Sequence, residues 1–136
     1  MVYDTKIAVV IRADLQSWQK VNVACFLCGG LAGTYPEIVG EPYRDAGGQA
    51  YAPLIRQPVL IYGAGPEELK RTRERALSRG LNVPIYTEEL FQTGNDADNR
   101  AAVAAVAGDA LNLVGIALYA ERKIVDKVTG GLKFLS

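Results

Sequence analysis

Hydrophobic residues gather along the chain into runs of two different lengths. Residues 7–11 (Ile-Ala-Val-Val-Ile) are apolar at every position, and residues 58–62 and 111–119 are nearly so. Short apolar runs rich in Val and Ile are typical of strands buried on both faces. Residues 21–32 form a longer run that also contains Ala, Leu and Cys, and its length favours a buried helix. We therefore predict strands at the short runs and a helix over the long one.

Proline and glycine mark a second helix and a further strand. Pro66, followed by Glu67 and Glu68, is a typical helix start, and Gly80 is the expected stop. Residues 82–86 predict a strand that contains Pro84. Because proline lacks the N–H that a sheet ladder needs, Pro84 is expected either in an edge strand or at the start of a strand.

Two irregular segments lie between these elements. Residues 34–57 hold the turn sequence Asp45-Ala46-Gly47-Gly48, so we expect a short hairpin that pairs residues 41–44 with 49–52. A loop of this length in a small domain often covers a site or meets a partner. Residues 92–100 are densely polar, and Asn95 or Asp96 is expected to cap a helix that continues to Ala107.

The alternation of strands and helices predicts an α/β fold. We expect one domain over residues 1–136, built as a three-layer α/β/α sandwich on a mixed, mostly parallel sheet of four or five strands. Its candidate site is the polar turn after the first strand, because α/β folds bind ligands at the carboxyl ends of strands. Candidate catalytic residues are Lys20 and Asp14. The candidate ligand-binding residues are Ser17, taken as the helix N-cap, with Asn22, Thr87, Thr93 and Asn95.

Composition narrows the chemistry. Fifteen basic residues balance fifteen acidic ones, which argues against nucleic acid as a partner. The chain has no His, so His-based triads and His metal ligands are excluded, and no metal or cofactor is expected. No apolar run reaches the roughly 20 residues of a membrane span, and the first residues lack the apolar core of a signal peptide. A cytoplasmic location is the expectation.

The two cysteines form a Cys25-x-x-Cys28 pair inside the predicted first helix. Reactive pairs of this type sit at a helix N-terminus, where the helix dipole lowers the thiol pKa. We therefore interpret both thiols as core residues that share one helix face, with redox chemistry and metal binding as the alternatives.

Particular segments resemble known families. Residues 9–15, Lys20 and the ending 124–135 resemble type II peptidyl-tRNA hydrolases. The whole chain is similar to a bacterial family, the domain-of-unknown-function family numbered two thousand. The residues that carry this similarity are Asp14-Leu15, Asn22, Ile38-Val39-Gly40, Asp45-Ala46-Gly47-Gly48 and Pro58-Val59-Leu60-Ile61. The resemblance implies a peptidyl-tRNA hydrolase II-like fold and assigns no activity.

Three functions remain open from the sequence. The first is binding of a small anionic ligand, with Lys20 supplying the charge beside the free N–H groups of a helix start. The second is hydrolysis of acyl or peptidyl esters, which the hydrolase resemblance implies. The third is a structural partner protein that associates through residues 34–57, and a homodimer is one form that this association would take.

Overall fold

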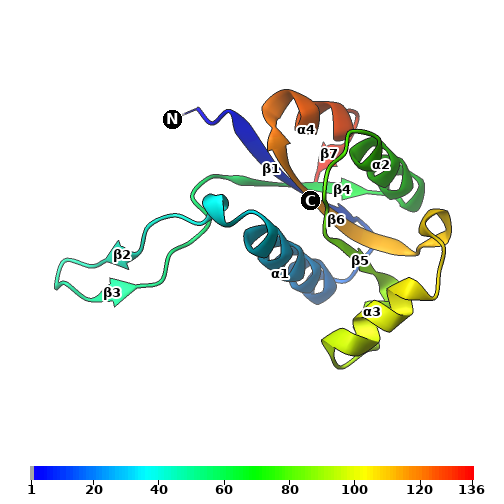
Figure 1. Cartoon of the computed structure of the whole chain (residues 1–136), viewed down its shortest axis with the longest axis horizontal. Helices are drawn as coiled ribbons and strands as arrows, with labels where there is room; N and C mark the ends of the chain where they lie inside the picture. The colour runs from blue at the N-terminus through cyan, green and yellow to red at the C-terminus, as the bar shows by residue number, and fades with distance from the viewer. Residues whose placement is uncertain (1) are drawn as a thin grey trace.

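The protein, described here over residues 2–136 by a computed structural model, is built on a five-stranded sheet. The strand order is β5-β6-β1-β4-β7 (Figure 1). The strands are β1 (Thr5–Arg12), β4 (Val59–Ala64), β5 (Ile85–Thr87), β6 (Leu113–Glu121) and β7 (Lys133–Phe134). The helices are α1 (Ser17–Thr34), α2 (Pro66–Ser78), α3 (Asp96–Ala104) and α4 (Arg122–Val128), with short 3-10 turns η1 (Pro36–Ile38), η2 (Glu88–Phe91) and η3 (Gly108–Ala110). An α/β fold on a mixed sheet is confirmed.

The prediction of a mostly parallel sheet is wrong. Only β1 and β4 pair in parallel, whereas β1–β6, β5–β6 and β4–β7 are antiparallel. The segment between β5 and β6 runs through η2, α3 and η3, and it returns the chain to the sheet from the end at which β1 and β5 finish. Strand β6 therefore enters the sheet in the reverse direction. An apolar run shows that a strand is buried but carries no information about its direction.

Side chains of β1 alternate between two apolar clusters on opposite faces of the sheet. Ile7, Val9 and Ile11 belong to a cluster with Val23, Leu27 and Leu31 of α1. Ala8 and Val10 belong to a second cluster, formed with residues of α2 and α4. Because side chains of a strand point alternately to its two faces, helix α1 covers one face and α2 and α4 cover the other (Figure 1).

Helix α1 begins one residue away from the predicted cap. Gln16, rather than Ser17, is the N-cap residue, and its backbone N–H donates to Oε1 of Gln19 at 3.0 Å. Gln19 thereby supplies the reciprocal half of a capping box. Ser17 is the first helical residue and is exposed. The side-chain oxygen of Gln16 accepts a hydrogen bond from the indole N–H of Trp18 at 2.8 Å.

The expectation for the cysteines is also wrong in part. Cys25 is exposed, Cys28 is half-buried, and both are free thiols. Helix α1 is apolar on nearly all sides, so its sequence has no polar face from which the buried side could be deduced. Burial raises the pKa of the Cys28 thiol, and the neighbouring Cys25 adds to this rise.

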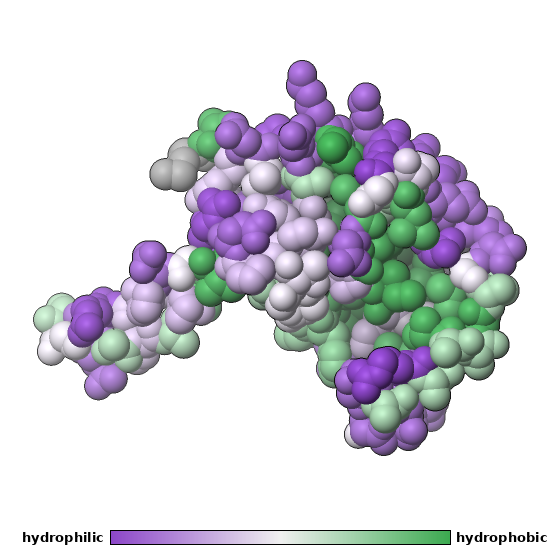
Figure 2. Space-filling view, in the orientation of Figure 1, coloured by the Kyte–Doolittle hydropathy of each residue, from purple (hydrophilic) through white to green (hydrophobic). Residues whose placement is uncertain are grey.

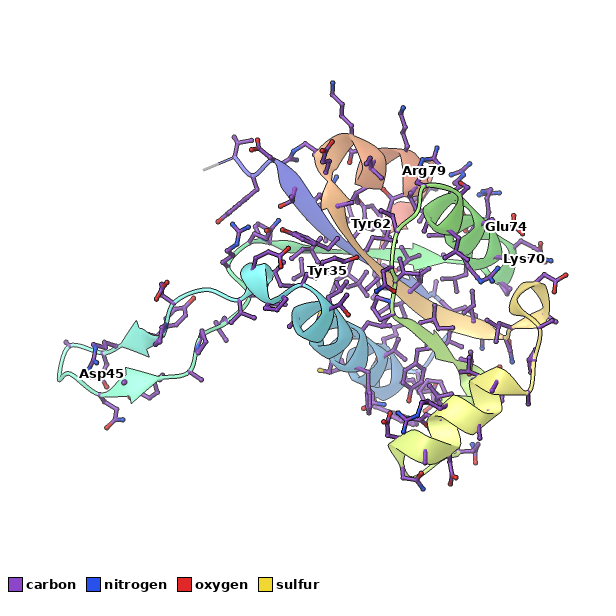
Figure 3. All side chains as sticks on the ribbon, viewed as in Figure 1. Tyr35, Asp45, Tyr62, Lys70, Glu74 and Arg79 are labelled. Atoms are coloured by element: carbon purple, nitrogen blue, oxygen red, sulfur yellow. The ribbon has the colours of Figure 1, made fainter. Side chains whose placement is uncertain are left out.

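The predicted hairpin is present as an arm, which we define as residues 41–54. Its strands β2 (Tyr43–Arg44) and β3 (Ala50–Tyr51) pair in antiparallel fashion, and the arm extends away from the sheet and helices (Figure 1). Asp45, at the tip (Figure 3), accepts hydrogen bonds from the N–H groups of Gly47 and Gln49. Gly48, with φ +92°, takes the left-handed conformation that the turn needs.

Helix α3 is the least attached helix of the body. It ends at Ala104 rather than at the predicted Ala107, and none of its residues is buried. The expected cap is confirmed, because the Asn95 side chain accepts a hydrogen bond from the N–H of Asp98 at 2.8 Å. None of the helices in residues 2–136 combines the length and hydropathy needed to cross a membrane.

Candidate functional site: the groove between α1, β5 and α3

A groove of about 540 Å³ lies between α1, edge strand β5 and α3. Figure 2 shows hydrophobic surface in the hollow between α3 and the rest of the molecule. The volume falls within the roughly 300–1,000 Å³ that is usual for small-molecule sites. Its apolar walls consist of Phe26, Leu27, Pro84, Ile85, Leu90, Val103 and Ala104. The groove exists because α3 stands beside β5 without burying a side chain against it.

Aromatic rings form a continuous wall from α1 to η2. Phe26 meets Tyr86 with ring centroids 5.6 Å apart, and Tyr86 meets Phe91 at 5.2 Å. Phe91 in turn contacts Trp18, edge to face, at 5.8 Å. Such ring pairs add stability beyond their buried area. Phe26, which lines the groove, nevertheless stays more than half exposed and keeps apolar area available for a ligand, whereas the similarly exposed Trp18 lines a neighbouring shallow pocket.

The Tyr86 phenol is the polar group at the base of this wall. Asn22 of α1 is within hydrogen-bond reach of it, with 3.5 Å between Asn22 Nδ2 and Tyr86 Oη. Burial raises the pKa of Tyr86, and the contact with Asn22 offsets part of the rise. The phenol is therefore neutral at physiological pH and can both donate and accept a hydrogen bond. This contact also fixes α1 against β5.

The outer rim of the groove is polar and belongs to α3. Asp96, Asn99 and Arg100 line it, and Arg100 forms an ion pair with Asp96 one turn away. Both partners are largely exposed, at 70% and 80% of their side-chain areas. Exposed pairs of this kind contribute only about 0–1 kcal/mol, so a ligand carboxylate can compete with Asp96 for the guanidinium.

The turn after β1 holds a separate polar cluster. Arg12 donates from Nε to Asp14 at 2.7 Å and from Nη1 to Glu88 at 3.4 Å, and Asn112 donates to Glu88 at 2.8 Å. Partial burial lowers the pKa of Arg12, but the two carboxylates outweigh it and raise that pKa above its ordinary value. The cluster ties the end of β1 to the start of η2 and to the residue before β6.

The predicted residues of α1 lie on different sides of the helix. Ser17 and Asn22 line a shallow, open pocket together with Trp18, Val21 and Cys25. Lys20 is half-buried, and within residues 2–136 its ammonium makes no hydrogen bond or ion pair. Asp14 pairs with Arg12 instead. The catalytic roles assigned to Lys20 and Asp14 stay predictions.

Of the three predicted residues at and after the end of β5, Thr93 and Asn95 are held by local contacts, whereas Thr87 is buried at the end of the strand. Thr87 is only 1% exposed, and its Oγ1 has no hydrogen-bond partner among residues 2–136. The Thr93 hydroxyl donates to the Leu90 carbonyl at 3.0 Å and contacts Asn99. Asn95 caps α3. Thr93 and Asn95 thus shape the turn that presents α3 to the groove, and their ligand contacts stay predictions.

Sequence reasoning missed the residues that line the groove. Phe26, Leu90 and Val103 are ordinary apolar residues, and nothing in their spacing distinguishes a groove wall from a core. One signal was available, because residues 96–104 carry Ala and a single Val but no large side chain able to fill a core. A helix with such a small apolar face leaves space between itself and its neighbours.

The sequence and the fold agree with one family. The model of the family described as "Protein of unknown function (DUF2000)" matches residues 5–136. The chain belongs to this family. It is also similar to a solved structure of a protein of unknown function from Agrobacterium tumefaciens strain C58, with 45% identity and a TM-score of 0.96 over 99% of this chain and 100% of that one. No protein with a curated description matches the chain. The resemblance to type II peptidyl-tRNA hydrolases stays a prediction.

The described part of the chain shows no cluster of metal-ligating side chains. Across residues 2–136, no three Cys, Asp or Glu side chains gather in a way that would hold a metal ion. The groups that the groove offers are the phenol of Tyr86, the amide of Asn99 and the ion pair of α3. Neutral and charged hydrogen-bonding groups of this kind bind and orient a ligand.

Proposed function

We propose that this protein binds a small ligand that has an apolar body and an acidic group, and that the ligand lies in the groove between α1, β5 and α3. The observation that carries the proposal is the groove itself, a space of about 540 Å³ with apolar walls and a polar rim on one side. An apolar body would remove Phe26, Leu90 and Val103 from water, which is the main source of affinity in such sites.

The acidic group is assigned to the rim of α3. Arg100 offers a planar set of donors that suits a carboxylate, and its partner Asp96 is exposed and weakly held. Asn99 supplies an amide next to it. A ligand of this kind would place its carboxylate against Arg100 and its apolar part against the aromatic wall.

A second location for the anion is the turn after β1. The observation in its favour is the Lys20 ammonium, which makes no side-chain bond within residues 2–136 and lies in the first turn of α1. Against it stands the charge of the neighbouring cluster, where Asp14 and Glu88 face the single cation Arg12. We therefore place the ligand in the groove and treat Lys20 as the alternative.

A binding series on the intact protein tests the proposal. Octanoate serves as the acidic probe and octanol as its neutral counterpart, with binding followed by chemical shifts of amides along β5 and α3. We expect octanoate to shift the groove residues and Val103→Asp to abolish the shifts. Leu77→Asp is the matched control, because Leu77 is exposed and, like Val103, is the penultimate residue of its helix. Shifts that survive Val103→Asp would overturn the groove assignment.

Two further variants locate the charge and test the hydrolase alternative. Arg100→Gln is expected to weaken octanoate about tenfold while leaving octanol unchanged, which corresponds to about 1.4 kcal/mol. If Lys20→Met removes the preference for the acid instead, the anion lies at the turn after β1. Turnover of an octanoyl ester that disappears in Lys20→Met would favour the ester hydrolase over a binding protein.

A further inference from the structure

The arm has the composition of a contact surface but touches no other part of the molecule along most of its length. Residues 41–52 are all exposed, and among them Tyr43 and Tyr51 keep about half of their surfaces in water. Leu54, at the base of the arm, is also exposed. A two-stranded ribbon is marginally stable alone in water, so an arm with exposed aromatic and aliphatic side chains needs a surface to cover it.

The arm is nevertheless preformed. Asp45 holds its tip through Gly47, Gln49 and the Tyr51 hydroxyl, the last at 2.7 Å. At the base, the N–H of Gly40 donates to the carbonyl of Leu54 at 2.8 Å. The arm therefore projects in a defined direction from the end of α1 and η1 (Figure 1), and a partner would not have to order it.

The outer side of α1 is an uncovered apolar surface in the same chain. We define it by Trp18, Val21, Cys25, Gly29 and Gly33, which follow the helical spacing of one face. Val21 is 64% exposed, and a Cβ added at Gly29 or Gly33 would meet no other atom within 4 Å. Helix α1 carries a single charged residue, Lys20. The arm, whose own charged residues are Glu41, Arg44 and Asp45, can therefore lie along this side without meeting a row of charges on the helix.

The arm is long enough to cover much of the helix. The extended part of the arm, residues 40–45, spans about 17 Å at a rise of about 3.3 Å per residue, and the turn at its tip follows. Eighteen helical residues span about 27 Å at 1.5 Å each. Because the arm starts beside the C-terminal end of α1, an arm from a second copy placed antiparallel would lie along about two thirds of the outer side of this helix. In a dimer with a two-fold axis, each arm would then cover the outer side of the other copy's α1.

We propose that the arm of one copy packs on the outer side of α1 of a second copy, so that the protein is an arm-exchanged homodimer. The twelve exposed residues 41–52 and the outer positions of α1 approach the roughly twenty residues a side that a stable interface uses. The occupant of this surface is a second copy because each chain presents both the arm and the uncovered side, so one two-fold contact covers both. This surface lies beside the groove and excludes the groove's walls on β5 and α3.

Sedimentation equilibrium of the full chain tests the proposal. We expect the wild type to sediment at twice 14.7 kDa at tens of micromolar, and both Val21→Glu and Tyr43→Asp to sediment at 14.7 kDa. Leu77→Glu, an exposed apolar position on α2, is the matched control and should stay dimeric. A monomeric wild type, or a dimer that neither variant dissociates, would overturn the proposal. Circular dichroism confirms that each variant is folded.

A mixing experiment distinguishes this arrangement from arms that pair only with each other. Tyr43→Asp keeps an intact α1, and Val21→Glu keeps an intact arm, so a heterodimer of the two variants retains one of the two arm–helix contacts. We expect the mixture to form dimers at a concentration where each variant alone is monomeric. Failure of the mixture to dimerise would show that the arm does not pack on α1.

Discussion

Helices α1 and α2 cover opposite faces of the same sheet, but their outer sides differ. The outer side of α2 is polar, whereas that of α1 is largely apolar. Helix α2 buries Leu69, Thr72 and Ala76 and turns charged side chains outward, among them Lys70 and Glu74, and its C-cap residue Arg79 is also exposed (Figure 3). Helix α1 buries Val23, Leu27 and Leu31 in the same way but carries exposed apolar residues on its other sides. Packing the inner face of an amphipathic helix buries its apolar surface. A helix that is apolar on all sides still exposes apolar surface after the same packing.

The difference teaches where function should be sought. Surface apolar residues scattered singly need no explanation, but those of α1 are contiguous and border both the groove and the side proposed for the arm. The outer side of α2 offers charged groups that are solvated and need no partner. Both proposals therefore rest on α1 and its neighbours, and α2 provides the matched controls.

The largest expected effects test whether the inner sides of the two helices are equivalent. Leu27→Ala in α1 and Leu69→Ala in α2 each remove a side chain that is at most 1% exposed. Each change should lower the free energy of unfolding by about 2–5 kcal/mol, since it removes apolar contacts and leaves a cavity. Urea unfolding measures both. A loss at Leu27 below 1 kcal/mol would mean that α1 is not packed on the sheet as α2 is.

A smaller effect is expected where α1 approaches the sheet most closely. A Cβ at Gly115 of β6 would lie 2.6 Å from Val23 and 2.9 Å from Leu27, so Gly115→Ala forces these side chains to shift. We expect a loss of about 1–3 kcal/mol in urea unfolding. Gly33→Ala is the control, because its Cβ meets nothing within 4 Å and alanine favours a helix by up to about 1 kcal/mol. Equal effects at both positions would contradict the close packing at Gly115.

Patterns that depend on neighbouring residues were enough to predict α2, the hairpin turn and the edge position of β5. Pro66 with Glu67 starts α2, Asp45 closes the turn, and Pro84 precedes a strand that pairs on one side only. In each case the cause is local, because proline geometry and short side-chain hydrogen bonds do not depend on distant parts of the chain.

Features that depend on distant residues could not be predicted in the same way. The direction of β6 follows from the path of the chain after β5, and the exposed position of Cys25 follows from which side of α1 meets the sheet. The groove arises from what α3 fails to bury, so its walls have no motif. The predicted site residues were chosen for their polar side chains, and several of these side chains cap a helix or make contacts within a turn.

The cysteines provide a test of the two sides of α1 in which no large change of stability is expected. Cys25 is exposed, whereas burial raises the pKa of Cys28 and so lowers its thiolate fraction at neutral pH. We expect a maleimide to label Cys25 several times faster than Cys28, as mass spectrometry of the two single variants Cys25→Ser and Cys28→Ser would show. Faster labelling of Cys28 would show that Cys28, and not Cys25, lies on the solvent-exposed side of α1. In the proposed dimer, labelling of Cys25 should also slow as protein concentration rises.

The smallest expected effect is a local change in the arm at acidic pH. Hydrogen bonds from the Tyr51 hydroxyl and from the N–H groups of Gln49 and Gly47 lower the pKa of Asp45. A carboxyl whose pKa is lowered on folding stabilises the turn above its unfolded value, near 3.8, and loses this contribution as the pH falls through the lowered value. Amide resonances of Gly47 should therefore move below about pH 4 while those of Val9 in β1 stay in place. Asp45→Asn should remove the pH dependence at Gly47, and a transition that persists in this variant would show that another group controls the arm.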